Sequence, residues 1–312
     1  MIESIQIAGY RGIRTGELLG LAPLTILVGP NGAGKSSALE ALEIVRGNAS
    51  EESLQHALTR RGWSGLAALR SIVGAKIAWT EEPEAEHTLK VQLVANTPTT
   101  IVAMSDGGER VTVDFGEEGS RGGIASAYAP ATPTFIEIQP GSPDEIRQII
   151  SRADLDHRLA SVVKLLTTFI PGLTDLRLLQ PGTRPAIFAV EGEARYPLSE
   201  AADGAKRALS ISERIVRDSS GLILIEEPEA FMHPRAMRAI ASVLWGAIEM
   251  GKQVVFTTHS LEFIDAILAA ARADLAKLAL FRMRMQDGAL VSARIDGARV
   301  ADLRERLGED LR

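Results

Sequence analysis

A glycine-rich stretch near the N-terminus has the composition and spacing of a phosphate-binding loop. The letters GPNGAGKS at 29–36 satisfy the pattern G-x-x-x-x-G-K-[ST], between an apolar run at 24–28 and a stretch with helical spacing. Glycines let successive backbone N–H groups turn inward around a phosphate, with the N-terminus of a helix behind them. This agreement of pattern with context argues against a chance glycine turn. The residues expected to contact nucleotide are Gly29, Pro30, Asn31, Gly32, Ala33, Gly34, Lys35, Ser36 and Ser37.

Two side chains of this loop have a chemical role in the pattern. Lys35 is expected to reach the β- and γ-phosphates of the nucleotide, ATP, and the Ser36 hydroxyl is expected to ligate Mg²⁺.

Two adjacent carboxylates follow a second apolar run. Leu222–Ile225 is followed directly by Glu226 and Glu227. Ligands bind at the carboxyl ends of strands in open α/β sheets, so acids at this position can serve a Mg²⁺–nucleotide site. We assign Glu226 to the metal and Glu227 to the general base that acts on the attacking water. In a chain without a phosphate-binding loop, a solvated strand end would be the simpler interpretation.

A histidine, His259, follows a third apolar run at 253–258. An isolated histidine is more often a hydrogen-bonded core residue. Its position after a strand end, beside the other two motifs, favours a contact with the γ-phosphate and the attacking water. Lys35, Glu227 and His259 are therefore the expected catalytic residues.

The elements that must position these residues alternate in type. Strands and helices alternate around continuous apolar runs, which predicts an α/β fold of the P-loop type with a mostly parallel core sheet. Short β-like runs predict an antiparallel β lobe at 75–132, after a helical stretch at 53–73. Amphipathic stretches at 143–152 and 155–170, followed by a hairpin, predict a helical subdomain within 140–198. The remaining elements are expected as helices at 203–217 and 233–250 and as strands at 2–8, 134–138, 222–225 and 253–258, with a tail of helix, two strands and helix.

Composition limits the classes of function. The chain has 312 residues, of which 46% are apolar and 24% charged, as in globular proteins with a sizeable core. The net charge of −6 means that nucleic acid would need a local basic patch. The absence of cysteine excludes disulfides, thiolate metal sites and a cysteine nucleophile. Without a signal peptide or an apolar run of about 20 residues, the expectation is a cytoplasmic protein that does not contact a membrane.

Together, the segments GPNGAGKSSALEAL, IEEPEAFMHPR and FTTHS resemble ABC-type ATPases of the overcoming-lysogenization-defect (OLD) and RecF-like group, relatives of the structural-maintenance-of-chromosomes (SMC) heads. The segments IESIQIAGYRGI and AADGAKRALSI resemble that group too. The resemblance implies one ABC-type ATPase domain over residues 1–312, with a signature helix and an acidic strand in 199–312. OLD nucleases carry a C-terminal TOPRIM domain, and the residues after His259 instead look like the end of the ATPase.

Two further site residues follow from the resemblance alone. Gln139 is similar to the Q-loop glutamine, which contacts Mg²⁺ and senses the γ-phosphate. Gly204 lies where the signature helix should begin, so its backbone N–H could bind the γ-phosphate held by a second copy of the chain, with the nearby Ser199 as the alternative signature contact. Lys206 or Arg207 could supply charge to that copy, although solvated helix cations are the simpler interpretation.

The function expected from these observations is an ATPase that works as a dimerising switch or motor with itself, with a nuclease or other effector, or on DNA. DNA binding is implied by family analogy alone. The alternatives are an ATPase subunit of a transporter, a scaffold that binds nucleotide without hydrolysing it, and a small-molecule kinase. The Glu-Glu-Pro strand end and the Thr-Thr-His motif disfavour the last of these, since neither has a role in phosphorylating a small acceptor.

Overall fold

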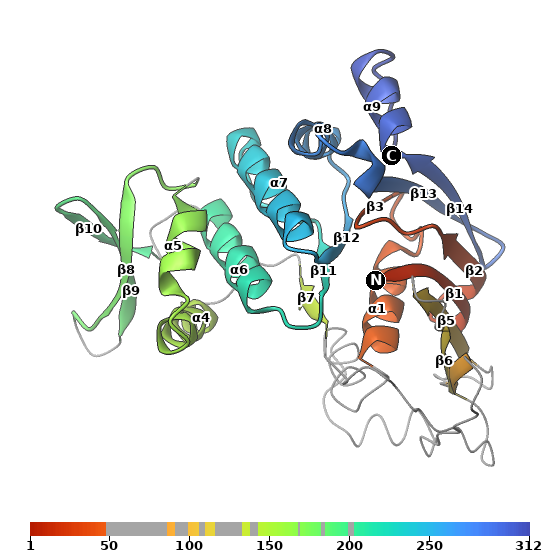
Figure 1. The fold of residues 1–312 in the computed structure, drawn as a ribbon, viewed down its shortest axis with the longest axis horizontal. Coiled ribbons are helices and arrows are strands. Elements are labelled where there is room, and N and C mark those ends of the chain that lie inside the picture. The colour runs from red at the N-terminus through yellow and green to blue at the C-terminus, as the bar shows by residue number, and fades with distance from the viewer. Residues whose placement is uncertain are drawn as a thin grey trace.

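The computed structural model describes residues 1–47, 86–90, 99–105, 110–115, 133–137, 143–167, 169–181, 185–198 and 203–312. Strands in these ranges form an 11-stranded sheet in the order β4-β6-β5-β1-β2-β14-β13-β3-β12-β11-β7 and a three-stranded sheet in the order β10-β9-β8 (Figure 1). The strands are β1 Ile2–Tyr10, β2 Ile13–Leu19, β3 Leu24–Val28, β4 Glu86–Lys90, β5 Thr99–Ser105, β6 Arg110–Phe115, β7 Thr134–Ile136, β8 Leu173–Leu179, β9 Ala186–Glu191, β10 Ala194–Pro197, β11 Leu222–Glu226, β12 Gln253–Thr257, β13 Leu278–Gln286 and β14 Ala289–Asp296. The helices are α1 Lys35–Arg46, α4 Pro143–Leu155, α5 Leu159–Leu166, α6 Asp203–Arg217, α7 Pro234–Glu249, α8 Leu261–Ala270 and α9 Gly297–Glu305, with a 3-10 turn at Leu275–Lys277.

The centre of the large sheet is parallel. Strand β3 pairs in parallel with β12 and β13, and β11 pairs in parallel with β12 and β7. Glu226 is paired with Thr257, and Thr257 is paired with Leu27. The carboxyl ends of β3, β11 and β12 therefore lie at one edge of the sheet, where the phosphate-binding loop, the acidic pair and His259 follow them.

Apolar residues on both faces explain why these central strands are buried. Their side chains alternate between two clusters, as expected for strands covered on both sides. Leu27, Leu224 and Val255 join the cluster that contains α1. Ile26, Ile225 and Phe256 join the cluster that contains residues of α6, α7 and α8. The sheet is thus held between α1 and a layer of three helices (Figure 1).

The other part of the large sheet is mainly antiparallel. Strand β1 pairs antiparallel with β2 and β5, and β5 pairs antiparallel with β6. The antiparallel lobe predicted at 75–132 is correct for β5 and β6, whereas β4 pairs in parallel with β6. A short parallel pairing of β2 with β14 joins this part to the parallel centre.

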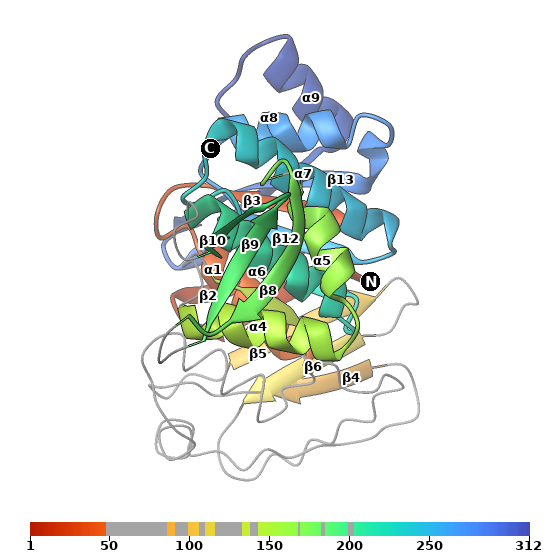
Figure 2. The ribbon, with the colours of Figure 1, turned by 90° about the vertical axis from the view of Figure 1, so that its left-hand side faces the viewer.

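The three-stranded sheet and helices α4 and α5 lie at the end of the molecule opposite the antiparallel part of the large sheet (Figure 1). Helices α4 and α5 lie between this sheet and α6 (Figure 1), and Figure 2 shows the sheet from its open side. The predicted hairpin corresponds to β8 and β9, and β10 extends it by a strand that the sequence pattern did not predict.

The two predicted helices correspond to α4 and α5, and the one predicted at 203–217 corresponds to α6. The stretch predicted as helical at 53–73 lies outside the described residues. None of the helices that the structure describes is long and apolar enough to cross a bilayer.

Candidate functional site

The phosphate-binding loop connects β3 directly to α1. Gly34 stands immediately before α1 with a φ of 85°, and α1 begins at Lys35. The Lys35 ammonium donates to the carbonyl oxygens of Gly29 at 2.7 Å and Pro30 at 3.0 Å. Burial lowers the pKa of Lys35, and the nearby Glu227 carboxylate opposes that shift. The lysine is therefore held inside the loop, close to the acidic pair.

Gly29 is required by its surroundings. Its φ of 147° lies in a region that favours glycine, and a Cβ added there would lie 2.2 Å from the Met283 carbonyl oxygen. The neighbouring strand β13 thus passes directly against the start of the loop, and any side chain at position 29 would push the two apart.

The acidic pair stands at the end of β11, as predicted. Glu226 is the last residue of the strand, and Glu227 follows it with a left-handed φ of 43°. The Glu227 N–H donates to the Thr257 carbonyl oxygen at 3.1 Å and lies 3.2 Å from the Thr257 hydroxyl. Because a left-handed conformation costs energy in a non-glycine residue, its surroundings must hold it in place.

His259 faces Glu227 across the site. Its Nε2 lies 3.9 Å from the Glu227 Oε1, and the two side chains are 37% and 32% exposed. This separation is too long for a direct hydrogen bond, yet one water at about 2.8 Å from each atom would fit between them. Burial lowers the pKa of His259, the Lys35 charge lowers it further, and Glu227 opposes both. The imidazole is accordingly neutral at neutral pH.

These residues line one cavity of about 710 Å³. Of the predicted site residues, the cavity brings together Asn31, Gly32, Ala33, Gly34, Lys35, Ser36, Ser37, Glu226, Glu227 and His259. Gly29 and Pro30 are not lining residues, although their carbonyl oxygens accept from the Lys35 ammonium of the cavity. The volume is within the range of pockets that hold ligands the size of a nucleotide.

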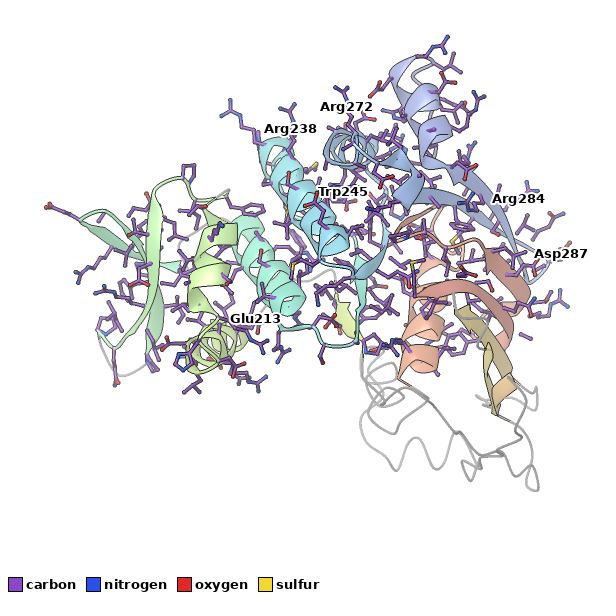
Figure 3. All side chains as sticks on the ribbon, in the orientation of Figure 1. Glu213, Arg238, Trp245, Arg272, Arg284 and Asp287 are labelled. Atoms are coloured by element: carbon purple, nitrogen blue, oxygen red, sulfur yellow. The ribbon has the colours of Figure 1, made fainter. Side chains whose placement is uncertain are left out.

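Two hairpin turns contribute cavity residues that sequence reasoning missed. Gly12 and Ile13 come from the turn between β1 and β2, and Met285 and Gly288 come from the β13–β14 hairpin. Figure 3 places Asp287 at the tip of that hairpin. An Asp-Gly pair between apolar strands predicts such a turn, although not its position beside the phosphate-binding loop.

The start of α6 lies outside this cavity. Gly204 is not among the lining residues, and it is buried against the segment that follows the acidic pair. A Cβ added at Gly204 would lie 3.3 Å from the Phe231 carbonyl oxygen. Gln139 lies outside the described residues.

The interpretation of Arg207 as a solvated helix cation is wrong. Its side chain is 1% exposed and donates to the carbonyl oxygen of Glu226 at 2.7 Å. Burial lowers the pKa of Arg207 to about 10. Helical spacing did not distinguish this arginine from the exposed cations because its burial depends on the strand ends packed against it.

The donor set fits Mg²⁺. Mg²⁺ at triphosphate sites takes one or two protein oxygen ligands and keeps phosphate oxygens and waters as the others. The Ser36 hydroxyl and the Glu226 carboxylate line the same cavity and can supply those ligands. A cluster of three or more His, Cys, Asp or Glu residues that could hold a metal ion is absent from the described ranges.

Two family models match parts of the chain. One is described as "AAA ATPase domain" and matches residues 1–102. The other is described as "AAA domain, putative AbiEii toxin, Type IV TA system" and matches residues 186–265. The first range contains the phosphate-binding loop, and the second contains the acidic pair and His259.

Two proteins of Methanocaldococcus jannaschii are similar in sequence. The "Uncharacterized protein MJECL11" is 35% identical over 111 residues, which are 35% of this chain and 97% of that protein. The "Uncharacterized protein MJECL10" is 42% identical over 71 residues, which are 21% of this chain and 32% of that protein.

Solved structures of SMC heads share the fold. The SMC head domain from Thermotoga maritima gives a TM-score of 0.53 at 16% identity, covering 95% of this chain and 99% of that one. A head domain with an extended coiled coil, bound to the C-terminal domain of ScpA from Pyrococcus furiosus, gives 0.54 at 14% identity and covers 99% of both chains. A head bound to the C-winged helix domain of ScpA gives 0.52 at 15% identity, covering 95% of this chain and 97% of that one.

Proposed function

We propose that this chain, which belongs to the same family as MJECL11 and is an AAA-type ATPase domain with the fold of an SMC head, hydrolyses ATP as a switch that closes two copies around nucleotide. The observation that carries the proposal is the convergence of Lys35, Glu227 and His259 on one cavity. In this proposal residues 1–312 work as one ATPase domain, located in the cytoplasm.

Each side chain of the cavity has a role that its chemistry supports. Lys35 neutralises charge on the β- and γ-phosphates. Ser36 and Glu226 would hold Mg²⁺, which draws charge from the phosphates when it is bound. Glu227 accepts the proton of the attacking water, and the neutral imidazole of His259 positions that water or the γ-phosphate beside it. We also keep Gln139 as a proposed contact of Mg²⁺ and the γ-phosphate.

Helix α6 is the element that would contact the nucleotide of a second copy. Gly204 and the helix start behind it carry the backbone N–H groups that we propose for phosphate binding, and Gly204 does not line the cavity of its own copy. A symmetric pair would place the α6 start of each copy at the cavity of the other. ATP would favour that pair because its γ-phosphate contacts both copies, whereas ADP lacks this contact.

Sedimentation with Mg²⁺ tests this function. Wild-type protein should hydrolyse ATP. The Glu227→Gln protein should sediment as a dimer with ATP and as a monomer with ADP. Lys35→Ala is the matched control that should stay monomeric with either nucleotide. A monomer that turns over ATP at the same rate at all protein concentrations would refute the switch, and a dimer insensitive to nucleotide would refute its control by ATP.

A partner completes the proposed switch. Two of the similar SMC heads were solved with domains of ScpA bound. By analogy we propose a protein effector for this chain, such as a nuclease, or a DNA duplex. Repeating the sedimentation with DNA distinguishes the two, because co-sedimentation that weakens with salt indicates phosphate contacts.

A further inference from the structure

A buried arginine and a buried glutamate lie behind the catalytic side of the cavity. Arg207 is on the second turn of α6, and Glu229 follows the acidic pair by two residues. They are 1% and 7% exposed. Burying a charged group is costly unless partners surround it, so both residues must serve contacts that the fold needs.

Arg207 joins α6 to two strand ends. Its guanidinium donates to the Glu137 carbonyl oxygen just after β7. The same group donates to the carbonyl oxygens of Glu226 at 2.7 Å and Glu227 at 3.3 Å. A guanidinium presents its donors in a fixed fork, so these contacts set the direction of the carbonyls as well as their distance.

Glu229 joins the same region to the end of β12. Its carboxylate accepts from the Thr258 hydroxyl and from the backbone of His259. Burial raises the pKa of Glu229, and these hydrogen bonds oppose the rise. Among the nearby carboxylates, Glu229 contributes the largest opposition to the lowered pKa of Arg207. Arg207 and Glu229 thus hold the same region through separate contacts, one with the Glu227 carbonyl oxygen and the other with the Thr258 hydroxyl.

The segment from Glu227 to Phe231 has a strained backbone at both ends. Glu227 has a φ of 43° and Phe231 a φ of 64°. A left-handed conformation at a non-glycine residue costs about 1–3 kcal/mol and persists only where its surroundings enforce it. At Glu227 the N–H is bonded to Thr257 and the carbonyl to Arg207, so the peptide groups on both sides of the proposed base are held.

We propose that Arg207 and Glu229 are a buried positioning pair, which holds the ends of β7, β11 and β12 so that Glu227 and His259 share one water. This inference rests on the proposed hydrolysis, and it extends that hydrolysis to α6. Helix α6, which begins at Asp203, then has a direct hydrogen-bonded path to the proposed base. Neither residue lines the cavity, so neither should contribute to nucleotide affinity.

The test compares Arg207→Lys with Arg214→Lys. Arg214 is on the same helix and donates to the Phe135 carbonyl oxygen in β7 at 3.0 Å, away from the acidic pair. Arg207→Lys should lower kcat at least tenfold, with the Kd for ATP within threefold of wild type, because a small misplacement of a catalytic group has effects of that size. Arg214→Lys should leave kcat within twofold of wild type.

Glu229→Gln keeps the volume of the side chain and should lower kcat as Arg207→Lys does. The double variant Arg207→Lys, Glu229→Gln should have a kcat only slightly below that of either single variant.

A second readout does not depend on turnover. In nucleotide-free protein, hydrogen exchange of the amides at 226–232 should accelerate at least tenfold in Arg207→Lys and stay unchanged in Arg214→Lys. Unchanged kcat and unchanged exchange in folded Arg207→Lys would overturn the proposal, as would a rise in KM with kcat intact. If Arg207→Lys does not fold, Glu229→Gln decides by the same two readouts. A wild-type protein that binds ATP without hydrolysing it would refute the proposed function alone. Hydrogen exchange in Arg207→Lys would then still test whether Arg207 and Glu229 hold the strand ends.

Discussion

Replacing Glu227 by glutamine should separate nucleotide binding from hydrolysis. Glutamine keeps the volume of the side chain and leaves the two backbone anchors, at Thr257 and Arg207, in place. The fold and the phosphate-binding loop should therefore be unaffected, and only the proposed proton acceptor is removed.

The size of the effect follows from the role and the exposure of the side chain. Loss of a general base lowers turnover by about 10²–10⁴-fold, equivalent to about 2.7–5.4 kcal/mol of transition-state stabilisation. Removing a negative charge also relieves repulsion of the γ-phosphate. A base that leaves room for one water would lie about 5 Å from that charge, and for a carboxylate as exposed as this one the relief is about 1 kcal/mol, or about fivefold in affinity.

Phosphate release at saturating ATP and titration with a fluorescent ATP analogue measure the two quantities on the same protein. The expected result is a kcat at least 100-fold lower with an affinity equal to or up to fivefold above that of wild type. Glu226→Gln provides the comparison, because loss of the proposed metal ligand should weaken Mg²⁺–ATP binding as well. A Glu227→Gln enzyme with turnover within threefold of wild type would refute the assignment of the base.

Three further predictions concern other parts of the molecule. Lys35→Ala should lower ATP affinity at least 100-fold by removing the main cation of the phosphate site, and unchanged affinity in a titration would contradict the loop assignment. Gly29→Ala should lower the thermal midpoint and ATP affinity together, because its Cβ would meet the Met283 carbonyl oxygen, whereas Gly246→Ala, in open space, is the control. The Asp218 side chain is 1% exposed and ion-paired with Lys252 at 2.9 Å, so Asp218→Asn should cost about 3 kcal/mol in urea unfolding at pH 7. Burial acts to raise the Asp218 pKa, but hydrogen bonds from Ser220 and Lys252 outweigh it and hold the pKa below its usual value. This contribution is therefore present above about pH 4 and is lost as the pH falls through the folded pKa. A gap between wild type and variant that stays constant down to pH 2 would contradict it.

Local sequence patterns predicted the parallel centre of the fold and most of the cavity. The phosphate-binding loop and the ends of β11 and β12 could be predicted because each combines an apolar run with the polar residues that follow it. Parallel pairing then aligns those ends without further information. The strand β10 was missed because four residues ending in a proline do not form an alternating pattern.

Contacts between distant segments account for what the sequence did not predict. Gly12 and Met285 meet at the cavity because β2 pairs with β14, with Thr15 opposite Ala289. No pattern within either hairpin indicates that pairing. Arg207 is a similar case, since the cation beside it in the sequence, Lys206, is only partly buried. Which of the two cations faces the strand ends depends on how α6 packs against them.

The distribution of strained residues connects these missed contacts to the site. Non-glycine residues with positive φ in the described ranges are Arg11, His157, Glu227, Phe231 and Asp287. All but His157 belong to turns that border the cavity or follow the acidic pair. Arginine side chains make contacts at three of these positions. Arg11 forms an ion pair with the buried Glu40. Arg14 donates a hydrogen bond to the Asp287 carbonyl oxygen, and Arg207 donates one to the Glu227 carbonyl oxygen.

Three arginines, the buried Arg207 and the exposed Arg11 and Arg14, therefore hold the walls of this cavity in conformations that the local backbone disfavours. Strain at a site persists only when its surroundings enforce it, so removing the arginine should alter the site before it unfolds the core. The core itself depends on apolar packing around β3, β11 and β12, which these arginines do not supply. For this reason substitutions of Arg14 and Arg207 should lower turnover by more than their effect on the free energy of unfolding would predict.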